Sequence, residues 1–302
     1  MGVQGRIPGT NYTMTVTFTA AAVQIAPSKA NYEENLDRVA EAVLKAQEAG
    51  ADLVVFPETA TTGYFLEGGV GDVAVPVGQL LADLIARLGD VAPVDVVLGF
   101  YEADEGRVYN SVAHMAFGDG ATVLHVHRKF FLPTYGVFDE ERFVARGRDV
   151  SAYDTRFGRF AMLICEDVWH SVTPTIAALK GAQVIVAIAA SPARGFTGDK
   201  PANLDTYHRL LRGISEEHGV FVINSMLVGF EGGKGFTGGS VVVSPLGEIL
   251  AEGPMAEEFM MTARIDMDLV EIARKKSPLL ADLVSVLEDV TREIDDVNDA
   301  IN

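Results

Sequence analysis

Short apolar runs recur along the chain and alternate with longer segments in which apolar positions lie three or four residues apart. The short runs are rich in Val, Ile and Phe, and they stop at Gly, Pro or charged residues, as buried β-strands do. The longer segments have the spacing of amphipathic helices. The pattern therefore predicts an α/β protein, with strands at residues 17–26, 52–56, 95–100, 111–117, 121–128, 160–165, 183–190, 220–226, 240–244 and 260–266.

The predicted helices have recognisable ends. Residues 36–44 carry an apolar stripe at helical spacing, and Asn31 and Glu34 precede it as a capping pair. Two further helices are expected to end at Gly89 and Gly219, because glycine readily adopts the left-handed conformation that terminates a helix. Helices that alternate with strands early in the chain, followed by hairpin-like strands, indicate mixed sheets with helices outside.

The length of 302 residues and the absence of a linker-like stretch indicate one large domain. We expect a flexible N-terminal tail at residues 1–15, a single domain at residues 16–278 and a C-terminal helix at residues 279–302. That helix carries a short heptad stripe, which either packs on its own domain or forms a subunit contact. The stripe consists of Leu283, Leu287, Val290, Ile294 and Val297.

Composition and charge narrow the classes of function. The chain has 24 basic and 42 acidic residues, and its net charge of −18 argues against nucleic acid and anionic membrane surfaces as partners. No apolar run is long enough for a transmembrane helix, and the polar N-terminus does not resemble a signal peptide. A single cysteine excludes an intrachain disulfide, so we expect a cytoplasmic protein.

Three chemically reactive side chains follow predicted strands. Cys165 ends the apolar run of residues 160–164, Glu58 follows the run of residues 53–57, and Lys129 follows the strand at residues 121–128. A thiol at the carboxyl end of a buried strand is a candidate nucleophile if a base and a charge stabiliser are near. None of the six histidines has evident partner chemistry. We therefore expect a carboxylate to accept the thiol proton and a lysine to lower the thiol pKa.

Each of these residues belongs to a longer block, and the three blocks stand in a fixed order: Phe56-Pro57-Glu58 with Thr62-Gly63-Tyr64, Arg128-Lys129 with Leu132-Pro133, and Cys165-Glu166-Asp167. These blocks resemble the motifs of the nitrilase superfamily of carbon-nitrogen hydrolases. The resemblance extends over residues 17–278 and implies a four-layer α-β-β-α sandwich with a catalytic triad of Glu58, Lys129 and Cys165.

One branch of that superfamily is especially similar, namely the glutamine-hydrolysing domain of NAD synthetases. The blocks at residues 135–140 and 165–169 carry this similarity. The superfamily uses a second glutamate between the lysine and the cysteine. The pattern places it at Glu140, with Glu141 as the alternative.

The chain also departs from this branch. It reaches Asn302 without a phosphate-binding glycine-rich loop, so we expect no ATP-using synthetase domain in it. The basic residue that binds the α-carboxylate of glutamine has no clean counterpart, although Arg194 and Lys200 lie in the corresponding segment. Glutamine as the substrate is therefore left open.

The resemblance implies hydrolysis of a non-peptide C–N bond in a small linear amide through a thioester, with water as the second substrate. Neither a metal nor an organic cofactor is expected, because no His/Cys ligand cluster is present. Three alternatives remain: a glutaminase component that supplies ammonia to a separate NAD synthetase, a nitrilase, and a noncatalytic interaction protein. We expect a homodimer or higher homo-oligomer. The expected substrate-binding residues are Tyr64, Tyr135, Glu166, Trp169 and Ser191.

Overall fold

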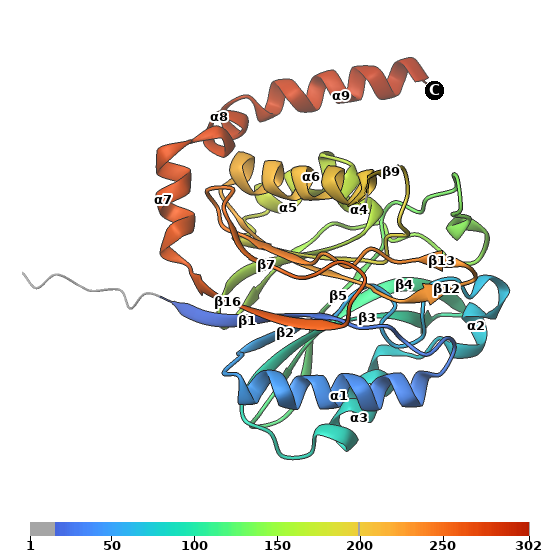
Figure 1. The fold of residues 1–302 in the computed structure, drawn as a ribbon. Helices are drawn as coiled ribbons and strands as arrows, with labels where there is room; N and C mark the ends of the chain where they lie inside the picture. Colours follow the sequence, from blue (N-terminus) through green and yellow to red (C-terminus); the bar gives the residue numbers. More distant parts are fainter. Residues whose placement is uncertain (1–15, 199, 302) are drawn as a thin grey trace, which may run out of the picture.

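Two six-stranded sheets stack face to face in the computed structural model, which describes residues 16–198 and 200–301 (Figure 1). The first sheet has the order β16-β1-β2-β3-β4-β5 and the second the order β15-β14-β11-β8-β7-β6. The first consists of β1 (Thr17–Gln24), β2 (Leu53–Val55), β3 (Val94–Asp104), β4 (Arg107–Phe117), β5 (Thr122–Arg128) and β16 (Phe259–Asp266). The second consists of β6 (Ala152–Thr155), β7 (Gly158–Ile164), β8 (Val184–Ala189), β11 (Phe221–Met226), β14 (Val241–Val243) and β15 (Ile249–Glu252).

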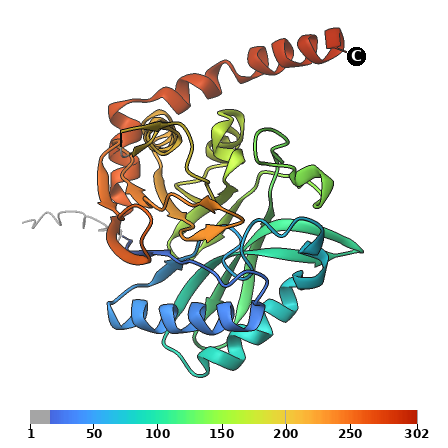
Figure 2. The ribbon, with the colours of Figure 1, turned by 45° about the vertical axis from the view of Figure 1, so that its right-hand side comes forward.

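Helices cover the outer face of each sheet (Figures 1 and 2). The first sheet is covered by α1 (Tyr32–Glu48) and α3 (Val77–Leu88), and the second by α5 (Val172–Leu179) and α6 (Ala202–His218). This arrangement confirms the α-β-β-α sandwich. The remaining elements are α2 (Val70–Val73), α4 (Glu166–Trp169), α7 (Asp268–Lys276), the 3₁₀ turns η1 (Glu67–Gly69) and η2 (Glu140–Arg142), and the short strand pairs β9 (Phe196–Thr197) with β10 (Lys200–Pro201) and β12 (Phe230–Glu231) with β13 (Lys234–Gly235).

Every predicted strand is present. Most of them coincide with a run that the fold buries, whereas β5 and β16 lie at the edges of the first sheet and are only partly buried. Strands β6 and β15 were not predicted. Both lie at edges of the second sheet and have few buried residues, so their sequences lack the apolar run that marks an interior strand.

The helix ends follow their local sequence. The Asn31 side chain accepts a hydrogen bond from the backbone N–H of Glu34 and donates one to the Glu34 carboxylate at 2.5 Å. Gly89 and Gly219 end α3 and α6 with φ angles of 63° and 58°, in the left-handed region that costs glycine least. The predicted caps are confirmed.

Apolar side chains form two main cores. One fills the space between the sheets and continues through the second sheet to helices α5 and α6, and the other lies between the first sheet and helices α1 and α3. The predicted stripe on α1 belongs to the second core, where Leu36, Val39 and Val43 are fully buried. Burying side chains of this size contributes about 1.5–3 kcal/mol each. This packing fixes the strands whose ends carry the reactive residues.

The C-terminal segment differs from the single helix expected there. It forms two helices, α8 (Leu279–Ser285) and α9 (Leu287–Ile301), which break at Val286. Helix α8 contacts α5 and α6, whereas α9 has no buried residue and extends beyond α6 (Figures 1 and 2). Leu287 and Val290 on its stripe are half-buried, whereas Ile294 and Val297 are 60% and 58% exposed, so the stripe is uncovered in the C-terminal half of α9.

None of the helices in the described part of the chain has the length and apolar content needed to cross a bilayer. The tail expected at residues 1–15 lies outside the described residues.

Candidate active site

Glu58 and Lys129 meet between the sheets after leaving different strands of the first sheet. Lys129 is the residue after β5, and Glu58 follows β2 closely. The Lys129 Nζ atom lies 2.8 Å from Glu58 Oε1, and both side chains are almost fully buried. The sequence predicted each strand end, and the fold brings the two charges into contact.

Both oxygens of the Glu58 carboxylate are held by donors. Oε1 accepts hydrogen bonds from Lys129 and, at 2.7 Å, from Asn110 Nδ2, while Oε2 accepts one at 2.6 Å from the backbone N–H of Ala190. Gly99 on β3 allows the Glu58 backbone to pack closely against this strand, because a Cβ atom at position 99 would lie 2.7 Å from Glu58 Cα. Fixed donors and close packing leave this carboxylate in one orientation.

Lys129 stands between two carboxylates. Its Nζ also lies 2.6 Å from Glu140 Oε1. Burial opposes the charged ammonium, but the charges of Glu140 and Glu58 outweigh it and raise the pKa of Lys129. The lysine is therefore a fixed positive charge.

Glu140, rather than Glu141, is the second glutamate at this lysine. Burial raises the pKa of Glu140 to about 7, although Lys129 opposes the shift, and nearby Glu58 adds to it. Its Oε1 also accepts a hydrogen bond from the Tyr64 hydroxyl, whereas Oε2 has no partner among the described residues. Glu141 is exposed on the same 3₁₀ turn.

Cys165 occupies a strained turn between β7 and α4. Its φ of 48° and ψ of −98° are unusual for a residue with a Cβ atom, and its backbone N–H is held by Ile188 O at 2.7 Å. A sharp strand-to-helix turn of this kind points a nucleophile out of the sheet. The strain is therefore located at the candidate nucleophile.

The thiol of Cys165 is protonated at rest. Burial raises its pKa well above the usual value, and the charge of Glu58 raises it further, while Lys129 lowers it. Lys129 thus acts in the expected direction, but it does not set the net shift of the thiol pKa. Burial outweighs Lys129, and the lysine charge is shared with two carboxylates.

Asp167 joins the cysteine turn to the segment after Lys129. Its carboxylate accepts hydrogen bonds from the backbone N–H groups of Phe130 and Phe131, both at 2.9 Å, and of Ile164 at 3.0 Å. It also contacts His127 Nε2 at 2.9 Å, and it is fully buried. One side chain thus fixes two of the three strand exits relative to each other.

A second buried carboxylate holds the backbone at Tyr64. Glu231, on the hairpin β12–β13, accepts hydrogen bonds from the N–H groups of Tyr64 and Phe65 at distances of 2.8 to 3.1 Å. The Tyr101 hydroxyl donates to Tyr64 O at 2.9 Å. Tyr64, which in turn contacts Glu140, is therefore held from both sides.

The other expected substrate-binding residues lie in different surroundings. The Tyr135 hydroxyl donates to the Glu166 carboxylate at 3.1 Å, with Tyr135 49% exposed and Glu166 buried. Trp169 packs against Tyr207 and the main core. Ser191 is buried, and its Oγ accepts a hydrogen bond from an Asn203 side chain at 2.9 Å.

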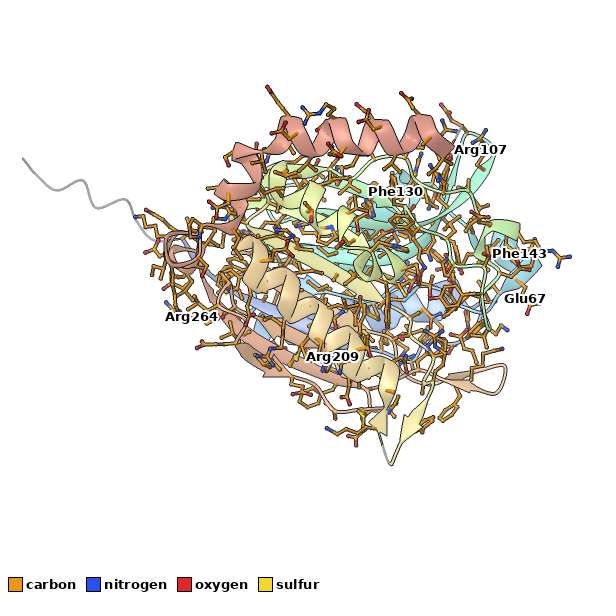
Figure 3. All side chains as sticks on the ribbon, turned by 90° about the horizontal axis from the view of Figure 1, so that it is seen from above. Glu67, Arg107, Phe130, Phe143, Arg209 and Arg264 are labelled. Carbon is orange, nitrogen blue, oxygen red and sulfur yellow. The ribbon has the colours of Figure 1, made fainter. Side chains whose placement is uncertain are left out.

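Two adjoining cavities open beside this cluster. The first, about 270 Å³, is lined by Tyr64, Glu140 and Asn110 together with Glu67 and Phe143. The last two are labelled on the right-hand side of Figure 3. The second, about 450 Å³, is lined by Phe196, Phe230 and Arg194, among others, and it shares Val137 and Lys234 with the first.

Arg194 and Lys200, the two basic residues in the segment that could bind a substrate carboxylate, lie in different surroundings. The Arg194 guanidinium lies 4.9 Å from the centroid of the Phe138 ring, and its buried Nε has no partner among the described residues. Lys200 is exposed on β10. Of these two residues, Arg194 is therefore the one that lines the second cavity, which Lys234 also lines.

Three residues of the site escaped prediction. Two of them have a detectable signal in the sequence. Asn110 is a polar residue inside an apolar strand, and Asp167 belongs to the block that contains Cys165. Glu231 lies in a glycine-rich turn that has the composition of a solvated loop. Its role depends on a contact with the distant Tyr64.

Comparisons with known proteins show the family of this chain. The family model for carbon-nitrogen hydrolase matches residues 19–275. The glutamine-dependent NAD(+) synthetase of Thermotoga maritima is 31% identical over 256 residues, which cover 81% of this chain and 41% of that protein. An (R)-stereoselective amidase from Pseudomonas sp is 30% identical over 269 residues, covering 86% of this chain and 89% of that protein.

A solved structure shows the same fold. The glutamine-dependent NAD+ synthetase from Acinetobacter baumannii superposes with a TM-score of 0.74 at 27% identity, covering 84% of this chain and 46% of that one. This chain therefore spans less than half the length of the synthetases that it matches.

Proposed function

Because this chain belongs to the carbon-nitrogen hydrolase family, we propose that it hydrolyses the C–N bond of a small linear amide through a thioester on Cys165. One observation carries the proposal: Lys129 is buried between the carboxylates of Glu58 and Glu140, and the charges of all three act on the Cys165 thiol. Such a cluster supplies a base and a fixed cation beside a nucleophile.

The first half of the reaction forms the thioester. Glu58 takes the proton from Sγ of Cys165 as the sulfur attacks the amide carbonyl carbon, and the C=O electron pair moves to oxygen. Lys129 and the backbone N–H of Glu166 stabilise that oxyanion. When the carbonyl re-forms, the C–N bond breaks and Glu58 returns the proton to nitrogen, so that ammonia or an amine leaves.

The second half uses water. Glu58 takes a proton from water as its oxygen attacks the thioester carbonyl, and Lys129 again stabilises the oxyanion. The C–S bond then breaks, the acid is released, and the proton on Glu58 returns to the thiolate. The raised pKa of the Cys165 thiol fits this cycle, because the proton leaves only when a base and an electrophile are both in place.

Glu140 has the geometry to position the substrate. Its Oε1 is used by Lys129 and Tyr64, whereas Oε2 lacks a partner among the described residues, and the side chain lines the first cavity. A substrate amide N–H donating to Oε2 would satisfy this buried acceptor. The proposed substrate-binding residues are Tyr64, Tyr135, Glu166, Trp169 and Ser191.

A second candidate function is that of a glutaminase component that passes ammonia to a separate NAD synthetase. The synthetase relatives support it, and so does Arg194, whose guanidinium at the second cavity suits the carboxylate of an amino-acid amide. This candidate predicts a partner-dependent activity, whereas the free amidase does not.

Ammonia release from a panel of glutamine, succinamic acid, propionamide and propionitrile tests both candidates. The amidase proposal expects turnover of at least one amide by the protein alone, loss of turnover in Cys165→Ala and Glu58→Gln, and near-normal turnover in Glu141→Gln. Turnover by Cys165→Ala at the wild-type rate would exclude the proposal. Glutamine turnover that appears only with an added NAD synthetase would favour the second candidate.

The proposal also covers the localisation and the oligomeric state of the protein. We infer a cytoplasmic homodimer or higher homo-oligomer, with residues 279–302 available for a subunit contact. The exposed apolar stripe on α9 supports the last point.

A further inference from the structure

A cavity of about 370 Å³ lies on the edge of the first sheet, apart from the two cavities at the active site. Its floor is the edge strand β5, which contributes residues 125–128. The loop at residues 146–149 forms a wall, and the Gly147 N–H donates to Lys129 O at 2.7 Å, which holds this loop against the strand. Arg107 and Tyr109 on β4 complete the lining.

The lining is strongly basic for so acidic a protein. Four arginines line it, Arg107, Arg128, Arg146 and Arg148, and Asp149 is the acidic residue among the lining side chains. The whole chain has a net charge of −18. Positive side chains gathered in one cavity of a protein whose net charge is negative indicate a local site that prefers an anion.

Most of this positive charge lacks an internal counter-ion. Arg128 is neutralised by Glu102 at 2.7 Å and Asp104 at 2.6 Å. Arg107, Arg146 and Arg148 are exposed, and none of them has a carboxylate within 4.0 Å in the described part of the chain. The Arg146 guanidinium lies 5.4 Å from the centroid of the Phe130 ring, a contact that orients it without neutralising it.

His125 also lines the cavity, but it does not add to the positive charge. His125 stacks on Tyr153 at 4.4 Å between ring centroids, and burial, together with His127 and His114, lowers its pKa to about 4. It is therefore neutral near pH 7, and the arginines carry the positive charge. Arginine binds phosphate oxygens through paired N–H groups, which makes arginine clusters typical of phosphate sites. The volume lies within the range of small-molecule pockets.

We propose that this cavity binds a phosphate-bearing small molecule. The occupant would contact the floor at His127, which in turn contacts Asp167, the carboxylate that holds the backbone of Phe130 and Phe131 next to Lys129. The proposal does not depend on the reaction at Cys165, since binding can be measured without turnover.

Calorimetric titration of the full chain in low-salt buffer with EDTA tests this proposal. The probes are inorganic phosphate, pyrophosphate and ATP, with succinate as a carboxylate dianion for comparison. The test variant is Arg146→Gln/Arg148→Gln. The matched control is Arg209→Gln/Arg264→Gln, which removes the same charge from positions well separated from Arg107 (Figure 3).

The expected result is saturable binding of at least one phosphate probe, weakened about tenfold or more in the test variant and about twofold or less in the control. Tighter binding of ATP than of pyrophosphate would identify a nucleotide-type ligand, and the reverse order would identify a compact polyphosphate. The proposal is overturned if no phosphate probe binds at millimolar concentration, if succinate binds as tightly, or if both variants lose affinity equally. Circular dichroism of both variants checks that the fold is intact.

Discussion

The ammonium group of Lys129 lies 2.6 Å from a carboxylate oxygen of Glu140, and Glu58 contacts the same ammonium from another side at 2.8 Å. One buried positive charge therefore serves two carboxylates, and the cluster has an excess of negative charge. Burial is the main cause of the raised pKa of both Glu140 and Cys165, and the charge of Glu58 raises both further. An oxyanion forming near Lys129 would be stabilised most when Glu58 has taken the thiol proton, because the excess is then removed.

The pKa of Glu140 predicts how stability depends on pH. It is raised from 4.5 to about 7, so the folded state binds a proton that the unfolded state has released. The resulting stabilisation is complete below pH 4.5 and is lost as the pH rises to about 7. Relative to Glu140→Gln, we expect wild-type protein to lose on the order of 3 kcal/mol of unfolding free energy over this range.

Urea unfolding of both proteins from pH 4.5 to pH 8 measures this difference. Glu141→Gln is the control, because its exposed side chain shares the same turn. Its curve should run parallel to that of the wild type. If the Glu140→Gln and wild-type curves are also parallel, Glu140 does not titrate in this range.

Gly99 should be intolerant of a methyl group. A Cβ atom there would lie 2.4 Å from Pro57 O and 2.7 Å from Glu58 Cα, so Gly99→Ala must displace the backbone of the proposed base. We expect a loss of about 1–3 kcal/mol in stability and a fall in kcat of about a hundredfold. Thermal unfolding and steady-state kinetics measure the two effects.

Gly213→Ala is the matched control for this substitution. Gly213 lies inside α6 with nothing within 4 Å of an added Cβ, so alanine should stabilise the protein by about 0.5–1 kcal/mol and leave kcat unchanged. If Gly99→Ala and Gly213→Ala change stability and kcat equally, the close contact between position 99 and Glu58 affects neither quantity.

Glu231 should affect catalysis through Tyr64. Glu231→Ala leaves the buried N–H groups of Tyr64 and Phe65 without an acceptor, which costs about 1–3 kcal/mol. We expect a reduced kcat as well, since Tyr64 contacts Glu140. Glu231→Gln keeps one acceptor oxygen and should recover part of both losses.

The control for Glu231 is another carboxylate that binds a backbone N–H. Glu258 accepts from Ala26 N at 2.8 Å and is half exposed, so Glu258→Ala should cost less than about 1 kcal/mol and leave kcat intact. A normal kcat in Glu231→Ala would limit Glu231 to a structural role.

Asp167 should be needed to keep the cysteine turn and the lysine segment in register. Asp167→Asn replaces an acceptor of several N–H groups with an amide that has one acceptor oxygen, so we expect a loss of about 1–3 kcal/mol. We also expect slower reaction of Cys165 with iodoacetamide, because the thiol no longer faces Lys129 and Glu58 correctly. Wild-type labelling kinetics in a folded variant would contradict this link.

The sequence predicted the strands that are buried, and it identified Glu58, Lys129 and Cys165 as residues at strand ends. It could not identify Asn110 or Glu231 as parts of the site, because their partners Glu58 and Tyr64 lie 52 and 167 positions away. The positive φ of Cys165 was also hidden, since cysteine has no preference for that region. The break at Val286 follows no glycine or proline, and so the heptad stripe suggested one continuous helix.

The central claim is that Cys165 becomes acylated, and intact-mass measurement of the protein quenched in acid during turnover tests it most directly. With a substrate from the amide panel, we expect a mass increase equal to the acyl group of that substrate, located at Cys165 by peptide mapping. The adduct should disappear when the amide is exhausted, and it should be absent in Cys165→Ala. Steady turnover of that amide with no adduct at any quench time, and with undiminished rate in Cys165→Ala, would contradict the account.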